Sequence, residues 1–229
     1  MRRFGSVTAL IGGLVALGLT LSGCAATDAA GPPPGDGPVV AFYGDSYTLG
    51  TGASDPSARW SSIISTERGW REFNPSVNGL GFVNNRTVVG DGDLPDQIIA
   101  QDPDIVMVTM GLNDNFSFGR AHDRIRAAIR TDLTRLREAL PEARIVVVEP
   151  FWYTSDRPGS VDTIIGWVRD EAAVIDADVI PGASRWLDGH YADDADSWMA
   201  ADGLHPNDRG YAEMAARMDE ALRRLDPPL

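Results

Sequence analysis

Four polar segments, far apart in the chain, carry side chains that together could transfer an acyl group. Ser46 supplies a hydroxyl, Asn113 an amide, and Asp202 and His205 a carboxylate and an imidazole three residues apart. A serine hydroxyl is a weak nucleophile unless a base within hydrogen-bond distance takes its proton. An imidazole can take that proton, and a carboxylate on its other nitrogen fixes the tautomer. The four segments are Gly44-Asp45-Ser46, Asn78-Gly79, Gly111-Leu112-Asn113-Asp114 and Asp202-Gly203-Leu204-His205.

Each segment also has an ordinary structural explanation. Gly-Asp-Ser is a common turn, and Gly-x-Asn-Asp can form a turn after a strand. Asp202 could simply cap a helix and leave His205 exposed to solvent. The combination favours an active site, because all four segments occur in one chain and three of them follow predicted strands.

Short apolar runs alternate with helical patterns, which predicts a three-layer αβα sandwich around a parallel, flavodoxin-like sheet of about five strands. The carboxyl ends of such strands share one edge, where the reactive crevice lies, so we expect the four segments to meet there. The predicted strands are Val39–Tyr43, Glu72–Val77, Ile105–Met110, Ile145–Val148 and Val179–Ile180, and the predicted helices cover Ser57–Arg68, the repeat from Ile125 to Leu140, Ile164–Ile175 and the repeat from Tyr211 to Leu222.

The segments resemble, in order, the sequence blocks of the SGNH subgroup of the GDSL esterase/lipase family, over nearly the whole mature chain. The resemblance implies that Ser46 is the nucleophile, His205 the base and Asp202 the acid. The second block is a single glycine, for which Gly79 has the usual spacing after the serine and Gly90 is the alternative.

The resemblance also implies an oxyanion hole and no cofactor. The backbone N–H groups of Ser46 and Gly79, with the side-chain amide of Asn113, would bind the oxyanion. No metal is expected either, because the acidic run at Asp193, Asp194 and Asp196 shows no calcium-binding pattern and is interpreted as a solvated loop. Two further histidines, His122 and His190, are interpreted as surface groups, and Asp45 as a brace for the nucleophile loop.

Length and charge narrow the class of protein. The 229 residues are enough for one domain with a full core. A formal net charge of −13 argues against a nucleic-acid partner, since binding phosphate requires a basic surface.

The first residues predict export. Arg2 and Arg3 precede an uncharged apolar stretch that ends near Leu21, as in a secretory signal peptide covering residues 1–23. Leu21-Ser22-Gly23-Cys24 resembles a bacterial lipobox, which implies cleavage before Cys24 and lipid attachment to its thiol; the alternative is a plain signal peptide with an incidental cysteine. Residues 24–38, rich in Pro and Gly, are expected to form a flexible linker to a hydrolase domain at 39–229.

We therefore expect an exported serine ester hydrolase, lipid-anchored on the outer face of the cytoplasmic membrane or secreted, and monomeric. No long apolar lid segment is evident, which favours short acyl groups, such as acetyl esters of glycans or small lipids. Two alternatives stay open. One is an O-acyltransferase with the same triad, and the other is a lipoprotein that binds acylated glycans without turnover.

Overall fold

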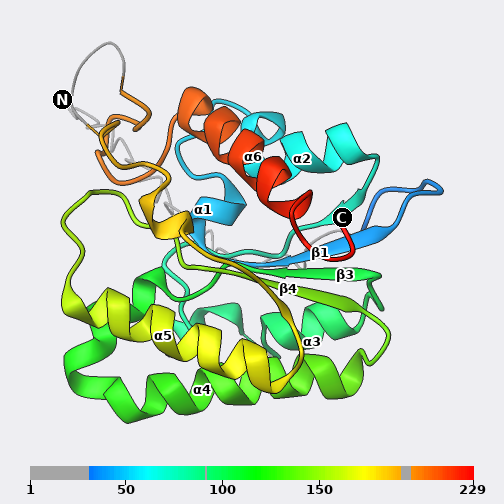
Figure 1. Ribbon diagram of the computed structural model, residues 1–229, viewed down its shortest axis with the longest axis horizontal. Coiled ribbons are helices and arrows are strands. Elements are labelled where there is room, and N and C mark those ends of the chain that lie inside the picture. The colour runs from blue at the N-terminus through cyan, green and yellow to red at the C-terminus, as the bar shows by residue number, and fades with distance from the viewer. Residues whose placement is uncertain (1–30, 91, 192–196) are drawn as a thin grey trace, which may run out of the picture.

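The computed structural model describes residues 31–90, 92–191 and 197–229, and its centre is a five-stranded parallel sheet (Figure 1). The strand order is β2-β1-β3-β4-β5, the flavodoxin-like order expected from the sequence. Strand β1 has β2 on one side and β3 on the other, with Val40 opposite Glu72 and Ile105. The strands are β1 Val39–Tyr43, β2 Arg71–Phe73, β3 Ile105–Val108, β4 Arg144–Val148 and β5 Asp178–Ile180.

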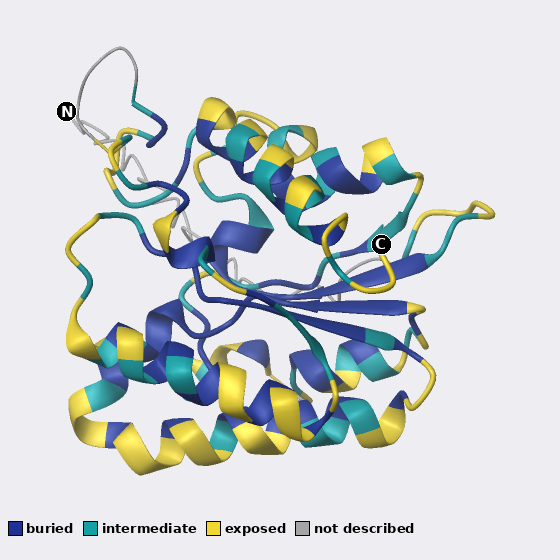
Figure 2. Cartoon of the chain, viewed as in Figure 1, coloured by how far each residue is buried: buried dark blue, intermediate teal, exposed yellow. Residues whose placement is uncertain are grey.

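Helices cover both faces of the sheet, which confirms the three-layer architecture (Figure 1). Helices α2 and α6 lie on one face and α3, α4 and α5 on the other. Their buried residues face the sheet and their exposed residues face solvent (Figure 2). Most of the buried residues are hydrophobic. The helices are α1 Ser46–Leu49, α2 Trp60–Arg68, α3 Leu94–Ile99, α4 Phe118–Ala139, α5 Gly159–Val174 and α6 Asp208–Leu222, with short 3-10 turns η1 Pro56–Ala58, η2 Arg86–Val89, η3 Leu112–Ser117 and η4 Ala183–Arg185.

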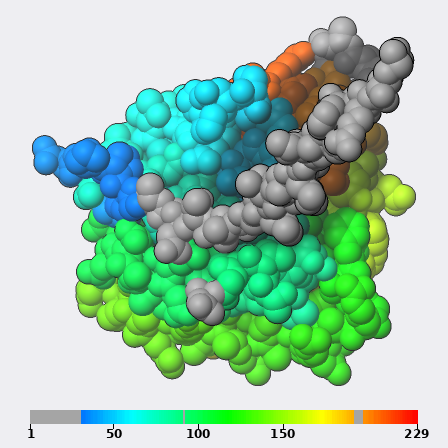
Figure 3. Space-filling view, turned by 180° about the vertical axis from the view of Figure 1, so that it is seen from behind, coloured from blue at the N-terminus to red at the C-terminus, as the bar shows by residue number. Residues whose placement is uncertain are grey.

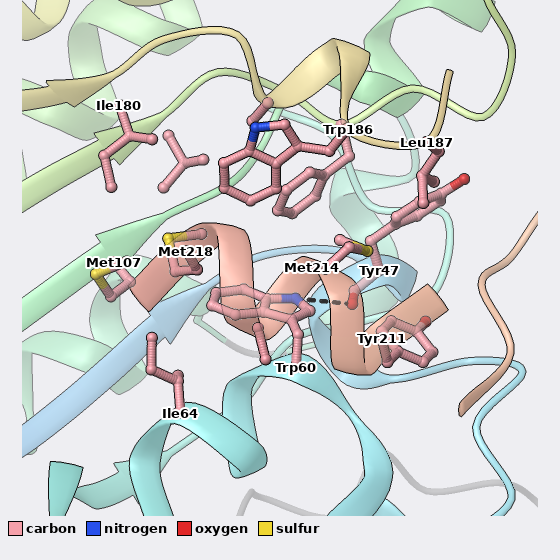
Figure 4. Packing of buried hydrophobic residues seen from close by; sticks show 14 of the residues in the cluster. Tyr47, Trp60, Ile64, Met107, Ile180, Trp186, Leu187, Tyr211, Met214 and Met218 are labelled. Atoms are coloured by element: carbon pink, nitrogen blue, oxygen red, sulfur yellow. Dashed lines mark hydrogen bonds between the residues drawn. The ribbon is translucent and has the colours of Figure 1, made fainter. Parts of the chain in front are cut away.

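The sheet divides the core into two hydrophobic clusters, because successive strand residues point to opposite faces. Phe42 packs in the cluster under α2 and α6, while its neighbour Tyr43 packs in the cluster over α3 and α4. In the first cluster the indole N–H of Trp60 donates to the backbone oxygen of Tyr47 at 3.0 Å (Figure 4). This bond ties α2 to α1, so the core reaches directly under the short helix that begins at Ser46.

The structure differs locally from the sequence predictions at three places. Strand β2 ends at Phe73 instead of Val77, because Pro75 has no N–H for the ladder and Asn74 turns the chain by accepting from the N–H of Ser76. Helix α3 was not predicted. It is only six residues long, too short to show a helical period. Ser46, expected in a loop, is instead the first residue of α1.

The described N-terminal residues 31–38 contain no helix or strand and project from the end of the sheet where β1 begins, opposite α1 (Figures 1 and 3). Arg71 of β2 donates to the backbone oxygen of Pro33 at 2.8 Å, which holds this segment beside the edge of the sheet. The predicted signal peptide and Cys24 lie outside the described residues. Among the helices that the structure describes, none has the length and apolar character needed to cross a bilayer.

Candidate active site

Ser46 is positioned by a tight connection between β1 and α1. At Gly44 a side chain would bring Cβ within 2.6 Å of Thr48 and Thr109, so this position must be glycine for the chain to turn here. Asp45 then caps α1 by accepting from the N–H of Tyr47 at 3.0 Å. The nucleophile candidate therefore stands at a helix N-terminus, beyond the carboxyl end of β1.

The turn before α6 delivers both other triad candidates. Asp202 Oδ1 accepts from the backbone N–H groups of Leu204 and His205, each at 2.9 Å, and its Oδ2 lies 2.7 Å from His205 Nδ1. His205 Nε2 lies 3.0 Å from Ser46 Oγ. The three side chains thus form a continuous hydrogen-bonded series, although 159 residues separate Ser46 from His205.

Asp202 is held in its ionised form. Partial burial opposes ionisation, but the hydrogen bonds from the imidazole and backbone of His205 and from the backbone of Leu204 outweigh it and lower the pKa of Asp202 to about 2. A carboxylate beside Nδ1 favours the tautomer that carries its proton there, which leaves Nε2 free to accept from the Ser46 hydroxyl. This geometry is the one that proton abstraction from Ser46 requires.

The turn itself is fixed to the rest of the site. The hydroxyl of Tyr47 donates to the backbone oxygen of Leu204 at 2.5 Å, and the N–H of Ala200 donates to the backbone oxygen of His205 at 2.8 Å. Tyr47 is fully buried, so the residue that follows Ser46 holds in place the segment that carries the imidazole.

A cavity of about 250 Å³ opens in front of Ser46 and His205. Gly79 is part of the cavity wall. It is the third residue of a turn in which the Leu80 N–H donates to the Val77 oxygen, and its φ angle is +70°. This left-handed conformation suits glycine. The alternative, Gly90, is exposed and is not part of the cavity wall. The lining residues are Ser46, Tyr47, Thr51, Asn78, Gly79, Leu112, Asn113, Phe116, Leu204 and His205.

Two of the three expected oxyanion donors are unengaged. Within the described parts of the chain, the backbone N–H groups of Ser46 and Gly79 donate to no other protein group. Both residues border the cavity, where an oxygen bound to a substrate carbon could accept from them.

The third donor, Asn113, is already hydrogen-bonded. Its Nδ2 lies 3.1 Å from Asp45 Oδ2 and 3.0 Å from the backbone oxygen of Leu80, and the residue is 7% exposed. An oxyanion must therefore share the amide hydrogens with these acceptors. The sequence indicated the amide but not this competition.

The other candidates lie away from the cavity wall. His122 packs against Phe118 of α4 and Trp167 of α5. The His190 ring stacks on Trp198, with 3.5 Å between the ring centroids. The acidic run at 193–196 lies outside the described residues. Among residues 31–90, 92–191 and 197–229, no three His, Cys, Asp or Glu side chains are grouped so as to hold a metal ion.

Sequence reasoning missed the apolar part of the cavity wall, formed by Leu112, Phe116 and Leu204. Phe116 is 52% exposed, which is unusual for a large aromatic side chain in this protein. Its position three residues after Asn113 was the available signal, because η3 carries both residues to the same cavity.

With this geometry established, comparison with known proteins assigns the family. The model of the GDSL-like lipase/acylhydrolase family matches residues 42–213. The chain belongs to this family. A GDSL lipase of Mycobacterium tuberculosis is 28% identical over 192 residues, which cover 78% of this chain and 79% of that protein. The GDSL family assignment makes this protein a carboxylic ester hydrolase.

Solved structures of esterases share the fold of this GDSL-family chain. The psychrotrophic esterase EstA from Pseudoalteromonas sp., in a structure inhibited by monoethylphosphonate, has a TM-score of 0.60 and 15% identity, covering 81% of this chain and 97% of its own. Axe2, an acetylxylan esterase from Geobacillus stearothermophilus, has a TM-score of 0.58 and 19% identity, covering 82% of this chain and 94% of its own.

Asp45 is a fully buried carboxyl group that precedes Ser46, the nucleophile candidate of this GDSL-family chain. Burial is the main reason that its pKa is raised to about 7. The negative charge of nearby Asp114 contributes to the rise, and the hydrogen bonds from Tyr47 and Asn113 oppose it. The folded protein therefore binds the Asp45 proton more tightly than the unfolded chain does.

We predict that Asp45→Asn changes how stability depends on pH. The stabilisation from the Asp45 proton is complete below pH about 4 and is lost as pH rises through about 7. Asparagine mimics the protonated acid and can still cap α1. Wild type should lose stability relative to Asp45→Asn between pH 4 and 8, by an amount on the order of 4 kcal/mol. Urea unfolding at several pH values measures this difference, and parallel curves for the two proteins would contradict it.

Proposed function

We propose that this protein is an extracytoplasmic serine esterase that hydrolyses short acyl esters, such as acetyl esters of glycans or small lipids, through an acyl-enzyme. The observation that carries the proposal is the hydrogen-bonded series from Asp202 through His205 to Ser46, which ends at the cavity. A hydroxyl in that position, next to an imidazole that a carboxylate orients, is an activated nucleophile.

The proposed reaction has two steps. His205 Nε2 takes the proton of Ser46 while Oγ attacks the ester carbon, and the carbonyl oxygen becomes an oxyanion. The bond from the carbon to the alcohol oxygen then breaks, and the imidazolium returns the proton to the leaving alcohol. In the second step water takes the place of the alcohol: it gives its proton to His205, attacks the acyl carbon, and releases the acid as Ser46 regains its proton.

The oxyanion hole is proposed to use three donors. The free N–H groups of Ser46 and Gly79 border the cavity, and the N-terminus of α1 adds the positive end of a short helix dipole. Asn113 contributes by redirecting or sharing an amide hydrogen that otherwise goes to Asp45 or Leu80. Donors held before the reaction need no reorganisation as charge develops.

The size of the cavity supports a short acyl group. A volume of about 250 Å³ is below the usual range of small-molecule sites, which begins near 300 Å³. Leu112, Phe116 and Leu204 give this small cavity an apolar wall that suits a methyl group or a short alkyl chain. The shared fold with an acetylxylan esterase is consistent with an acetyl ester as substrate.

The proposed location rests on the sequence. The basic start, the apolar stretch and the lipobox-like residues before Cys24 support export and lipid attachment. A lipid anchor at Cys24 would tether the domain through residues 24–38, of which the described part, 31–38, joins β1 at the end of the sheet opposite α1.

We predict that the soluble form that begins after Cys24 cleaves nitrophenyl acetate faster than a long-chain nitrophenyl ester, and that Ser46→Ala abolishes both activities. The variant should unfold at nearly the wild-type temperature, because it removes one hydroxyl from the edge of the core. A fluorophosphonate probe should label wild type and not Ser46→Ala.

The outcomes of this panel separate the alternatives. Unlabelled, inactive wild type would contradict the proposal and favour an acyl-glycan-binding lipoprotein. Transfer of the acyl group to an added sugar in preference to water would favour an O-acyltransferase. Faster cleavage of the long-chain ester would contradict only the preference for short acyl groups, not the esterase activity.

We predict that Asn113→Ala lowers turnover by about 10²-fold while the protein stays folded. The change removes one oxyanion donor, although Asp45 and the Leu80 oxygen also lose a partner. Steady-state kinetics and a thermal unfolding curve measure the two effects. A turnover equal to that of wild type would show that the N–H groups of Ser46 and Gly79 stabilise the oxyanion without Asn113.

We predict that Cys24→Ala abolishes lipid attachment in a bacterial host. Cys24 is the only cysteine in the chain, so no other thiol can accept the lipid. Incorporation of a clickable fatty acid, followed by membrane fractionation, measures this. Equal fatty-acid labelling of wild type and variant would rule out attachment at this thiol.

A further inference from the structure

We propose that Asp114 is a positioning residue that holds residues 79–84 so that the N–H of Gly79 faces the reacting carbonyl. The inference rests on the proposed function, because it concerns the oxyanion hole of that site. Asp114 follows Asn113 in the chain but does not line the cavity, so it would act through other residues.

The Asp114 carboxylate accepts from three consecutive backbone N–H groups. Oδ2 accepts from Phe82 at 2.7 Å, and Oδ1 accepts from Val83 at 2.8 Å and Asn84 at 3.1 Å. Asp114 is fully buried, which raises its pKa, while these three bonds oppose the rise. Three amides that point at one carboxylate permit only a narrow set of conformations for the backbone that carries them.

The segment also lies directly against the carboxylate. A Cβ at Gly81 would come within 2.6 Å of Asp114 Oδ1, so only glycine allows this approach. The N–H of Gly81 donates to the backbone oxygen of Asn84 at 2.9 Å, which closes residues 81–84 into one turn around the acid.

This turn reaches Gly79 through Asn84. The side-chain amides of Asn84 and Asn85 donate to the Gly79 oxygen at 2.9 and 3.2 Å. The N–H of Leu80 donates to the Val77 oxygen at 3.2 Å. The peptide group between Gly79 and Leu80 is thus held at both its oxygen and its nitrogen. The N–H of Gly79 belongs to the preceding peptide, between Asn78 and Gly79, which is the centre of the turn that the Leu80 N–H closes on the Val77 oxygen. Fixing the 79–80 peptide therefore restricts the φ and ψ angles of Gly79, whose freedom would otherwise let the neighbouring peptide reorient.

One short element coordinates both sides of the oxyanion hole. The 3-10 turn η3 presents Asn113 to the cavity and Asp114 to the 82–84 backbone, and Asn113 also donates to the Leu80 oxygen. Adjacent side chains therefore fix the amide donor and the glycine donor relative to each other.

The test compares Asp114→Asn, Asn84→Ala and the double variant with wild type, using nitrophenyl acetate. Asparagine cannot accept at both former oxygen positions, so one of the three amides loses its acceptor. Asn84 is partly exposed, and Asn84→Ala removes the nearer of the two side-chain amides that donate to the Gly79 oxygen, leaving that of Asn85. The matched control is Glu171→Gln, a buried carboxylate between α4 and α5 that binds Arg130.

We expect Asp114→Asn to lower kcat about 10-fold or more. This is less than the loss of about 10²-fold or more that follows removal of a whole oxyanion donor, because the Gly79 N–H is only misplaced. KM should change by less than about threefold. KM changes little because acylation and deacylation both pass through an oxyanion and slow together. Asn84→Ala should lower kcat less, and the double variant should fall no further than Asp114→Asn, because both changes act on the same peptide. Glu171→Gln should unfold at a lower temperature but keep the wild-type kcat.

A folded Asp114→Asn with wild-type kcat, or effects that multiply in the double variant, would overturn the positioning role. If Asp114→Asn does not fold, Asn84→Ala combined with Asn85→Ala decides, because together they remove both side-chain donors to the Gly79 oxygen. A lower kcat then supports the proposal, and an unchanged kcat overturns it. Failure of the proposed function gives a different result, since wild type itself would then show neither ester turnover nor phosphonate labelling.

Discussion

The arrangement of this site depends on one hydrogen bond, between His205 Nε2 and Ser46 Oγ, which joins the two ends of the domain. Ser46 follows the first strand, and His205 precedes the last helix. Their side chains meet because α6 packs with α2 on one face of the sheet, and because Tyr47 donates to the Leu204 oxygen. The contact between the imidazole and the hydroxyl therefore depends on packing across the whole domain.

A second constraint comes from the carboxyl ends of β1 and β3, which are neighbours in the sheet. The turn after β1 carries Ser46, and the turn after β3 carries Asn113, so the proposed nucleophile and the proposed amide donor lie side by side without a long loop. This is the position at which strand order reverses in an open parallel sheet. The same place concentrates two buried carboxyl groups, Asp45 and Asp114, whose acceptor oxygens organise the surrounding amides at a cost in desolvation.

Strands and helices with a strong hydrophobic pattern could be predicted directly from the sequence. Strands such as β1 and β3 are buried on both faces, so their residues are continuously apolar, and α4 shows a long helical repeat because one side packs on the sheet. Short elements gave weaker signals. Helix α3 has six residues, and β2 stops at Phe73, where the side chain of Asn74 and the missing N–H of Pro75 end the ladder.

The sequence by itself determined which residue types are present for acyl transfer and in what order, since Ser46, Asn113, Asp202 and His205 stand in recognisable segments at the ends of predicted elements. Only the tertiary structure showed that Gly79 lines the cavity and Gly90 does not, because the cavity wall is built by residues distant in the chain. Likewise only the structure showed that Asn113 is already shared between Asp45 and Leu80, and that Asp114 binds the 82–84 backbone. The direction of an N–H group and the competition for it depend on neighbours in space, which spacing along the chain does not specify.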